Sequence, residues 1–115
     1  MGCDCLTNFE NAYDIELIQG DYGSFVFHIT DENGNPLQNL SEVVFTSKRL
    51  NLEIKLEQLS DTNFLLVIES AMTSNIGACN ATYDITAVFD GYATPYTVIY
   101  NAKFIILKKD NSLSG

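Results

Sequence analysis

One stretch decides the expected fold of this chain: residues 78–107, which read ACNATYDITAVFDGYATPYTVIYNAKFIIL. From Cys79 to Phe89, apolar residues alternate with mostly polar ones, which is the period-2 pattern of a strand with one buried face. Asp90-Gly91 follows, and such a pair favours the positive φ values of a two-residue hairpin turn. The stretch therefore predicts a long β-hairpin.

If Asp90-Gly91 is the whole loop, alternate residues of the returning strand share one face: Tyr92, Thr94, Tyr96, Val98, Tyr100, Ala102, Phe104 and Ile106. The cross-strand pairs would then be Phe89 with Tyr92, Ile85 with Tyr96, and Tyr83 with Val98. Pro95 does not fit, because proline cannot donate to a strand ladder and belongs at an edge or a bulge. A hairpin of this length needs other strands to cover its apolar face.

Five shorter strands are predicted before the hairpin, separated by turn residues. We expect them at residues 13–18, 24–30, 42–47, 50–57 and 62–68, with a helical turn or loop at 70–76. Segment 62–68 is apolar on both faces and should lie centrally in a sheet. Together these strands predict an all-β fold, an immunoglobulin-like antiparallel β-sandwich of about seven strands. The predicted domain spans residues 13–107, between an N-terminal arm at 1–12 and a polar tail at 108–115.

Composition argues against several classes of partner. The net charge is −9 and the six Lys and Arg residues are scattered, so we expect no nucleic-acid binding. No apolar run approaches the roughly 18 residues of a membrane span, so membrane insertion is not expected. The first residues lack the order of a secretory signal, and three cysteines are an odd number. We therefore expect free thiols in a reducing compartment.

The sequence shows no recognisable catalytic constellation. His28 is the only histidine and lies on the strand face opposite Phe25 and Phe27, with no nucleophile motif and no Gly-rich phosphate loop. With 15 acidic residues, an apparent carboxylate pair is expected by chance and is no sign of glycoside hydrolysis. We expect neither an enzyme nor a cofactor.

A weak calcium-binding pattern spans the turn after residue 30. The ligand positions of an EF-hand loop would be filled by Asp31, Asn33, Asn35, Asn39 and Glu42. Pro36 occupies the position where that loop needs Gly, and the flanking segments are predicted strands rather than helices. An ordinary turn is the preferred interpretation, with calcium as the alternative.

Zinc has the right ligand types but the wrong spacing. Cys3-x-Cys5 lacks the two-to-four-residue gap of paired zinc cysteines, although Cys79 and His28 complete the set. Cys79 is more simply a small buried hydrophobe, and Cys3 and Cys5 are expected as exposed thiols on the arm. No metal site is predicted here.

The hairpin turn carries a candidate partner-binding site. Phe89, Tyr92 and Tyr96 lie near it, with Thr94 and Pro95 between them. Aromatic residues of this kind anchor protein interfaces. The alternative is that they cap one end of the core, and both interpretations stay open.

Three pieces of sequence resemble one family when taken in order. The first is Gln19-Gly20-Asp21 before Ser24-Phe25-Val26-Phe27, and the second is Asp31-Glu32-Asn33-Gly34-Asn35-Pro36-Leu37 with Leu40-Ser41 and Val43-Val44-Phe45. The third is Gly77, Ala81-Thr82-Tyr83-Asp84-Ile85, Asp90-Gly91, Thr97-Val98-Ile99-Tyr100 and Phe104-Ile105-Ile106. They look like motifs of the N-terminal domain of bacteriophage baseplate upper proteins and of related small phage tail and head-fibre modules. Ala78-Cys79-Asn80 makes the spacing between Gly77 and Tyr83 longer than in that pattern.

The resemblance covers most of residues 13–107 and implies a non-enzymatic virion structural module. Such a module docks onto or decorates a capsid, tail or baseplate component, after synthesis in the host cytoplasm. Its partners would be other virion proteins, and a homo-oligomer is left open. The part of baseplate upper proteins that carries receptor-binding proteins is not covered, so that function is not transferred. The alternative from another class is a cell-surface adhesin module that binds carbohydrate or calcium.

Overall fold

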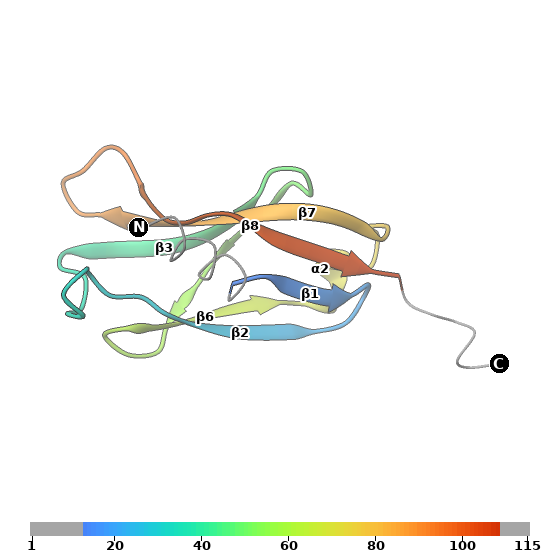
Figure 1. Cartoon of the computed structure of the whole chain (residues 1–115), viewed down its shortest axis with the longest axis horizontal. Helices are drawn as coiled ribbons and strands as arrows, with labels where there is room; N and C mark the ends of the chain where they lie inside the picture. Colours follow the sequence, from blue (N-terminus) through green and yellow to red (C-terminus); the bar gives the residue numbers. More distant parts are fainter. Residues whose placement is uncertain (1–12, 109–115) are drawn as a thin grey trace, which may run out of the picture.

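The structure, a computed structural model, describes residues 13–108, which form eight strands and one short helix (Figure 1). The elements are β1 Ile15–Ile18, β2 Gly23–His28, β3 Leu40–Ser47, β4 Leu52–Lys55, β5 Glu57–Gln58, β6 Asn63–Ile68, α2 Ser70–Thr73, β7 Cys79–Phe89 and β8 Tyr96–Leu107. The expected arm at 1–12 lies outside the described residues, as does the expected tail beyond Lys108. The prediction of an all-β sandwich is confirmed.

The strands form two sheets. The larger has the order β1-β8-β7-β3-β4, and the smaller has the order β2-β6-β5. Neighbouring strands pair antiparallel except β1, which runs parallel to β8. The strand β6 lies at the centre of the smaller sheet, as its two apolar faces predicted.

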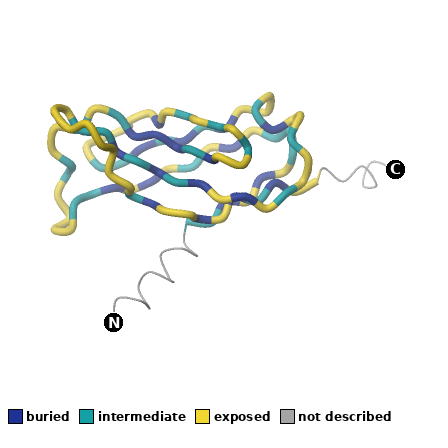
Figure 2. The backbone as a smooth tube through the Cα atoms, turned by 90° about the horizontal axis from the view of Figure 1, so that it is seen from above, coloured by how far each residue is buried: buried dark blue, intermediate teal, exposed yellow. Residues whose placement is uncertain are grey.

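The inner faces of the sheets meet in one hydrophobic core. Tyr83 of β7 stacks on Phe45 of β3, with ring centroids 5.1 Å apart, and meets Phe27 of β2 edge-on at 6.3 Å. Leu37, in the crossover from β2 to β3, and Leu40, at the start of β3, pack against this core. Figure 2 shows buried segments along the strands and exposed residues at both ends.

The predicted strand at 50–57 is two strands. Residues 52–55 form β4 in the larger sheet, whereas residues 57–58 form β5 in the smaller one. Leu56 is buried at the corner between them, and its N–H donates to the carbonyl oxygen of Val43 at 2.8 Å. Because alternation continues through the corner, the sequence pattern could not show that the chain changes sheets there.

The predicted hairpin exists, but its predicted register is wrong. Asp90-Gly91 does form a turn, in which the N–H of Tyr92 donates to the carbonyl oxygen of Phe89 at 3.2 Å and Gly91 has a φ of 84°. The ladder, however, begins only where Tyr96 pairs with Ala87. Pro95 cannot donate to a ladder, so residues 90–95 stay outside it as one loop.

A second irregularity changes the face that β8 presents. Between the pairs Tyr83–Ala102 and Ile85–Ile99, β8 contains one more residue than β7. Asn101 takes up this extra length with a φ of 60°, and its N–H donates to Asp84 Oδ1 at 2.7 Å. Such a bulge shifts the alternation of side chains along the strand.

The predicted face of β8 is therefore only half correct. Ala102, Phe104 and Ile106 are buried as expected. Tyr100 is exposed, and Ile99, which belonged to the other face in the prediction, is buried in its place. A further register shift between Ile85 and Thr86 restores the predicted alternation, so Tyr96 pairs with the buried Ala87, yet its side chain is exposed at the end of the strand.

Candidate partner-binding site at the hairpin tip

The loop after β7 and the segment before β3 meet at one end of the sandwich. Leu40 pairs with Phe89, and the N–H of Asp90 donates to the carbonyl oxygen of Asn39 at 2.8 Å. Asn39 adopts a φ of 59°, a left-handed conformation that asparagine tolerates better than most residues. These bonds hold Gln38 and Asn39 beside the hairpin tip.

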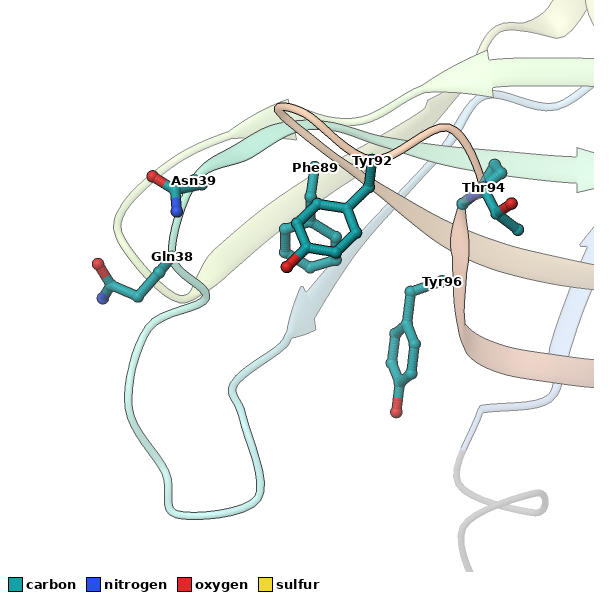
Figure 3. A pocket seen from close by; sticks show the side chains of 7 residues that line it. Gln38, Asn39, Phe89, Tyr92, Thr94 and Tyr96 are labelled. Atoms are coloured by element: carbon teal, nitrogen blue, oxygen red, sulfur yellow. The ribbon is translucent and has the colours of Figure 1, made fainter.

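The two segments line a pocket of about 450 Å³ that is open to solvent (Figure 3). Its lining consists of Gln38, Asn39, Phe89, Tyr92, Thr94, Pro95 and Tyr96. All three aromatic residues singled out by the sequence are among them. The backbone pairing of β3 with β7 brings the aromatic segment next to the segment of Gln38 and Asn39.

The aromatic rings at this site are largely accessible. Tyr92 is 72% exposed and Tyr96 is 63% exposed, whereas Phe89 is half-buried. Tyr92 meets Phe89 edge-on, with ring centroids 6.4 Å apart and an interplanar angle of 72°. In Figure 3 these two rings lie together and Tyr96 stands apart from them. Neither tyrosine is buried in the core, although Tyr96 pairs with the buried Ala87.

The chemistry of the pocket suits binding rather than proton transfer. None of its lining residues carries a charge, although the chain as a whole has a net charge of −9. Its polar groups are the amides of Gln38 and Asn39, two phenolic hydroxyls and the Thr94 hydroxyl. Such a surface can cover an apolar or uncharged polar group without desolvating a charge.

The carboxylate of Asp31 has a structural role in the turn that carries the weak calcium-binding pattern. Its Oδ1 accepts the N–H groups of Asn33 and Asn35, both at 2.9 Å. Glu42 lies 3.5 Å from the ammonium of Lys55 on the neighbouring strand. Within residues 13–108, no group of three or more His, Cys, Asp or Glu side chains is placed to hold a metal ion. Asp31 thus closes the turn in the manner of an Asx-turn.

The residues considered for zinc are not brought together in the described part of the chain. Cys79 begins β7 in the larger sheet and packs half-buried against the core. His28 ends β2 in the smaller sheet, exposed, with Nδ1 3.1 Å from Asn63 Oδ1. Cys3 and Cys5 lie outside the described residues.

Sequence reasoning missed Gln38 and Asn39 as members of the tip. Both follow a turn and carry amides, but nothing local indicates that they lie against residues 50 positions further on. Gln38 and Asn39 could have been found only by knowing that residues 40–47 pair with the hairpin. That pairing depends on the order of strands in the sheet, which the sequence pattern does not show.

No protein-family model matches the chain, and no curated protein matches its sequence. No helix among residues 13–108 is long and apolar enough to cross a membrane.

Proposed function

We propose that this chain is a non-enzymatic structural module of a bacteriophage virion, which docks onto a capsid, tail or baseplate component through its hairpin tip. One observation carries the proposal: two exposed tyrosines, Tyr92 and Tyr96, line an uncharged pocket at one end of the larger sheet. Exposed aromatic residues grouped around a pocket are typical of the energetic centre of a protein interface.

The resemblance described above supports the same surface. Its second piece, the turn at 31–37 with Leu40-Ser41, leads directly into the Gln38-Asn39 side of the tip. Its third piece contains Asp90-Gly91, whose N–H at Asp90 bonds to the carbonyl oxygen of Asn39. Two pieces that are far apart in the sequence thus build a single surface.

The backbone around the tip favours docking without a large entropy loss. The long strands β7 and β8 hold one side, and pairing of Leu40 with Phe89 holds the other. Phe89 and Tyr96 lie in strands, and Tyr92 follows a hydrogen-bonded turn, so binding has to immobilise mainly side chains and the short loop 90–95. Tyrosine also offers a large contact area for few rotatable bonds.

The test is the double variant Tyr92→Ala/Tyr96→Ala, assayed for thermal stability and for incorporation into virions by mass spectrometry of purified particles. Truncating an anchoring aromatic at an interface weakens binding by about 2 kcal/mol or more, roughly 30-fold in affinity. Because both side chains are exposed, the melting temperature should change little. We expect normal folding with lost incorporation.

A matched control is available in Tyr22→Ala/Tyr100→Ala. These tyrosines are 63% and 73% exposed and lie away from the pocket. The two control substitutions remove about as much exposed aromatic surface as the tip variant does, but outside the pocket. The control protein should therefore be incorporated into virions normally. Equal incorporation of the tip variant and the wild type would contradict the proposal.

A carbohydrate-binding adhesin module is the second candidate, and it is favoured by a pocket lined by two tyrosines together with Gln38 and Asn39. Sugar rings present an apolar face that an aromatic ring can cover, and hydroxyls that amides can hydrogen-bond. A glycan array probed with the wild type and the tip variant separates the two functions. Glycan binding that depends on Tyr92 and Tyr96, with unchanged virion incorporation, would favour the adhesin.

A further inference from the structure

The strand β2 forms an edge of the smaller sheet and is a different surface from the hairpin tip. It pairs with β6 through all six of its residues, without a register shift. Within residues 13–108, no strand pairs with its other side. An unpaired strand edge is a template for another strand, and most proteins protect it with charges, proline, a bulge or a cover.

The direction of the free backbone groups follows from the pairing with β6. The N–H of Ile29 donates to the carbonyl oxygen of Thr62, in continuation of that ladder. The backbone N–H and C=O groups of successive residues point to opposite sides of a strand. Those of Gly23, Phe25 and Phe27 therefore also point towards β6. The N–H and C=O groups of Ser24, Val26 and His28 therefore face away from the sheet.

The strand itself carries none of the residues that usually protect an edge. Residues 22–30 read YGSFVFHIT and contain no charged residue and no proline, in a chain with 15 acidic residues. Val26 is 60% exposed at the middle of the strand. On the outer face of the sheet it lies beside Leu65 of β6, which is only half-buried.

We propose that two copies of this chain associate through antiparallel pairing of β2 with β2, around a twofold axis at Val26. This register places Val26 opposite its own counterpart and Ser24 opposite His28. Each outward N–H of one copy then meets an outward C=O of the other, which is the ladder of an antiparallel sheet. An isologous contact of this kind is closed, so the product is a dimer and not a fibre.

The occupant that we propose for this edge is a second copy of the chain, whose own β2 is equally free of charged residues. Two molecules with a net charge of −9 repel one another, and the repulsion is smallest where an uncharged segment meets an uncharged segment. Asp14 lines a pocket together with Val26 and His28 of β2. The acidic residues nearest in sequence, Asp21 and Asp31, flank the strand at its two ends. In the twofold pairing they approach one another across the dimer, so added salt should tighten the association.

The contact is small, and we expect a reversible dimer. Six-residue strands bury less area than the roughly 1,200 Å² of a standard protein interface. Sedimentation analysis of the full chain from about 10 µM to about 1 mM covers the range of such weak complexes. We expect the average mass to rise towards that of a dimer with concentration, and to rise further in high salt.

The variant Val26→Lys tests the edge. The exposed position keeps the fold intact, whereas two lysines would face each other at the centre of the dimer. Leu59→Lys is the control, since Leu59 is 50% exposed and receives the same charge outside β2. Val26→Lys and Leu59→Lys both make the net charge of the chain less negative by one. If only Val26→Lys abolishes the dimer, repulsion between the net charges of the two copies cannot be the cause. We expect the control to associate like the wild type and Val26→Lys to stay monomeric.

Amide hydrogen exchange on the wild type provides an independent readout. At high concentration, the amides of Ser24, Val26 and His28 should gain protection, whereas those of Phe25 and Phe27 are already protected by β6. A dimer that leaves the three outward amides unprotected would overturn the proposal. So would a monomer in which these amides are protected at every concentration, because another part of the same chain would then cover the edge.

Discussion

Replacing Tyr83 with phenylalanine removes one hydroxyl from the centre of the sandwich and leaves the aromatic packing in place. Tyr83 is 1% exposed, and its hydroxyl donates a hydrogen bond to the backbone carbonyl oxygen of Tyr13. Its ring contacts Phe45, Phe27 and Phe104, with centroids 5.1, 6.3 and 6.4 Å away. A phenylalanine ring keeps all three of these contacts.

The expected loss at neutral pH is the value of one partly buried hydrogen bond, about 1 kcal/mol. Tyr13 is itself half-buried, so water can partly replace the lost donor. For a domain of this size, that loss lowers the melting temperature by about 4 to 8 °C. Truncation to alanine would remove the ring as well and cost about 3 to 5 kcal/mol. The comparison of Tyr83→Phe with Tyr83→Ala separates the hydroxyl from the packing.

At alkaline pH the difference between wild type and Tyr83→Phe should shrink. Burial, with a smaller contribution from the nearby Asp14 carboxylate, raises the pKa of the Tyr83 hydroxyl far above its ordinary value. In the unfolded chain the group ionises near pH 10, while in the folded protein it stays neutral. The contribution of Tyr83 is therefore complete below about pH 10 and falls by up to about 1.4 kcal/mol per pH unit above it.

Guanidinium unfolding followed by circular dichroism between pH 7 and pH 11 measures both effects. We expect Tyr83→Phe to be less stable at pH 7 and to lose less stability than the wild type above pH 10. Parallel pH profiles for the two proteins would refute the reasoning, because they would show that Tyr83 does not remain neutral in the fold. A variant as stable as the wild type at pH 7 would show that the hydrogen bond to Tyr13 contributes nothing.

Two further predictions concern the turn at Asp31 and the bulge in β8. Asp31→Ala should lower the free energy of unfolding by about 1 to 2 kcal/mol, equally with and without calcium, because Asp31 Oδ1 accepts two backbone N–H groups. Denaturant titration in millimolar calcium checks this, and stabilisation of the wild type that the variant lacks would support the calcium alternative. At Asn101, whose φ is 60°, glycine should be tolerated and alanine should destabilise by about 1 kcal/mol. Thermal unfolding of the two variants compares them, and equal melting temperatures would argue against a left-handed residue at this bulge.

The sequence by itself determined the kind of elements and most of their buried faces. Alternation is a local property, because successive side chains of a strand point to opposite sides. It correctly placed Ala81, Tyr83 and Ile85 towards the core, and the two apolar faces of 62–68 correctly indicated a central strand. The aromatic residues of the tip could also be singled out because Tyr92 and Tyr96 adjoin a turn, but the pattern did not show that both are exposed.

Only the tertiary structure decided which strands are neighbours, since that depends on contacts between residues far apart in the chain. The division of 50–57 at Leu56 follows from the position of the second sheet, and the bulge at Asn101 follows from the length mismatch between β7 and β8. That bulge turns Tyr100 outward and Ile99 inward, which no local pattern shows. The tip likewise gains Asn39 only because β3 pairs with β7, so its pocket exists only in the folded chain.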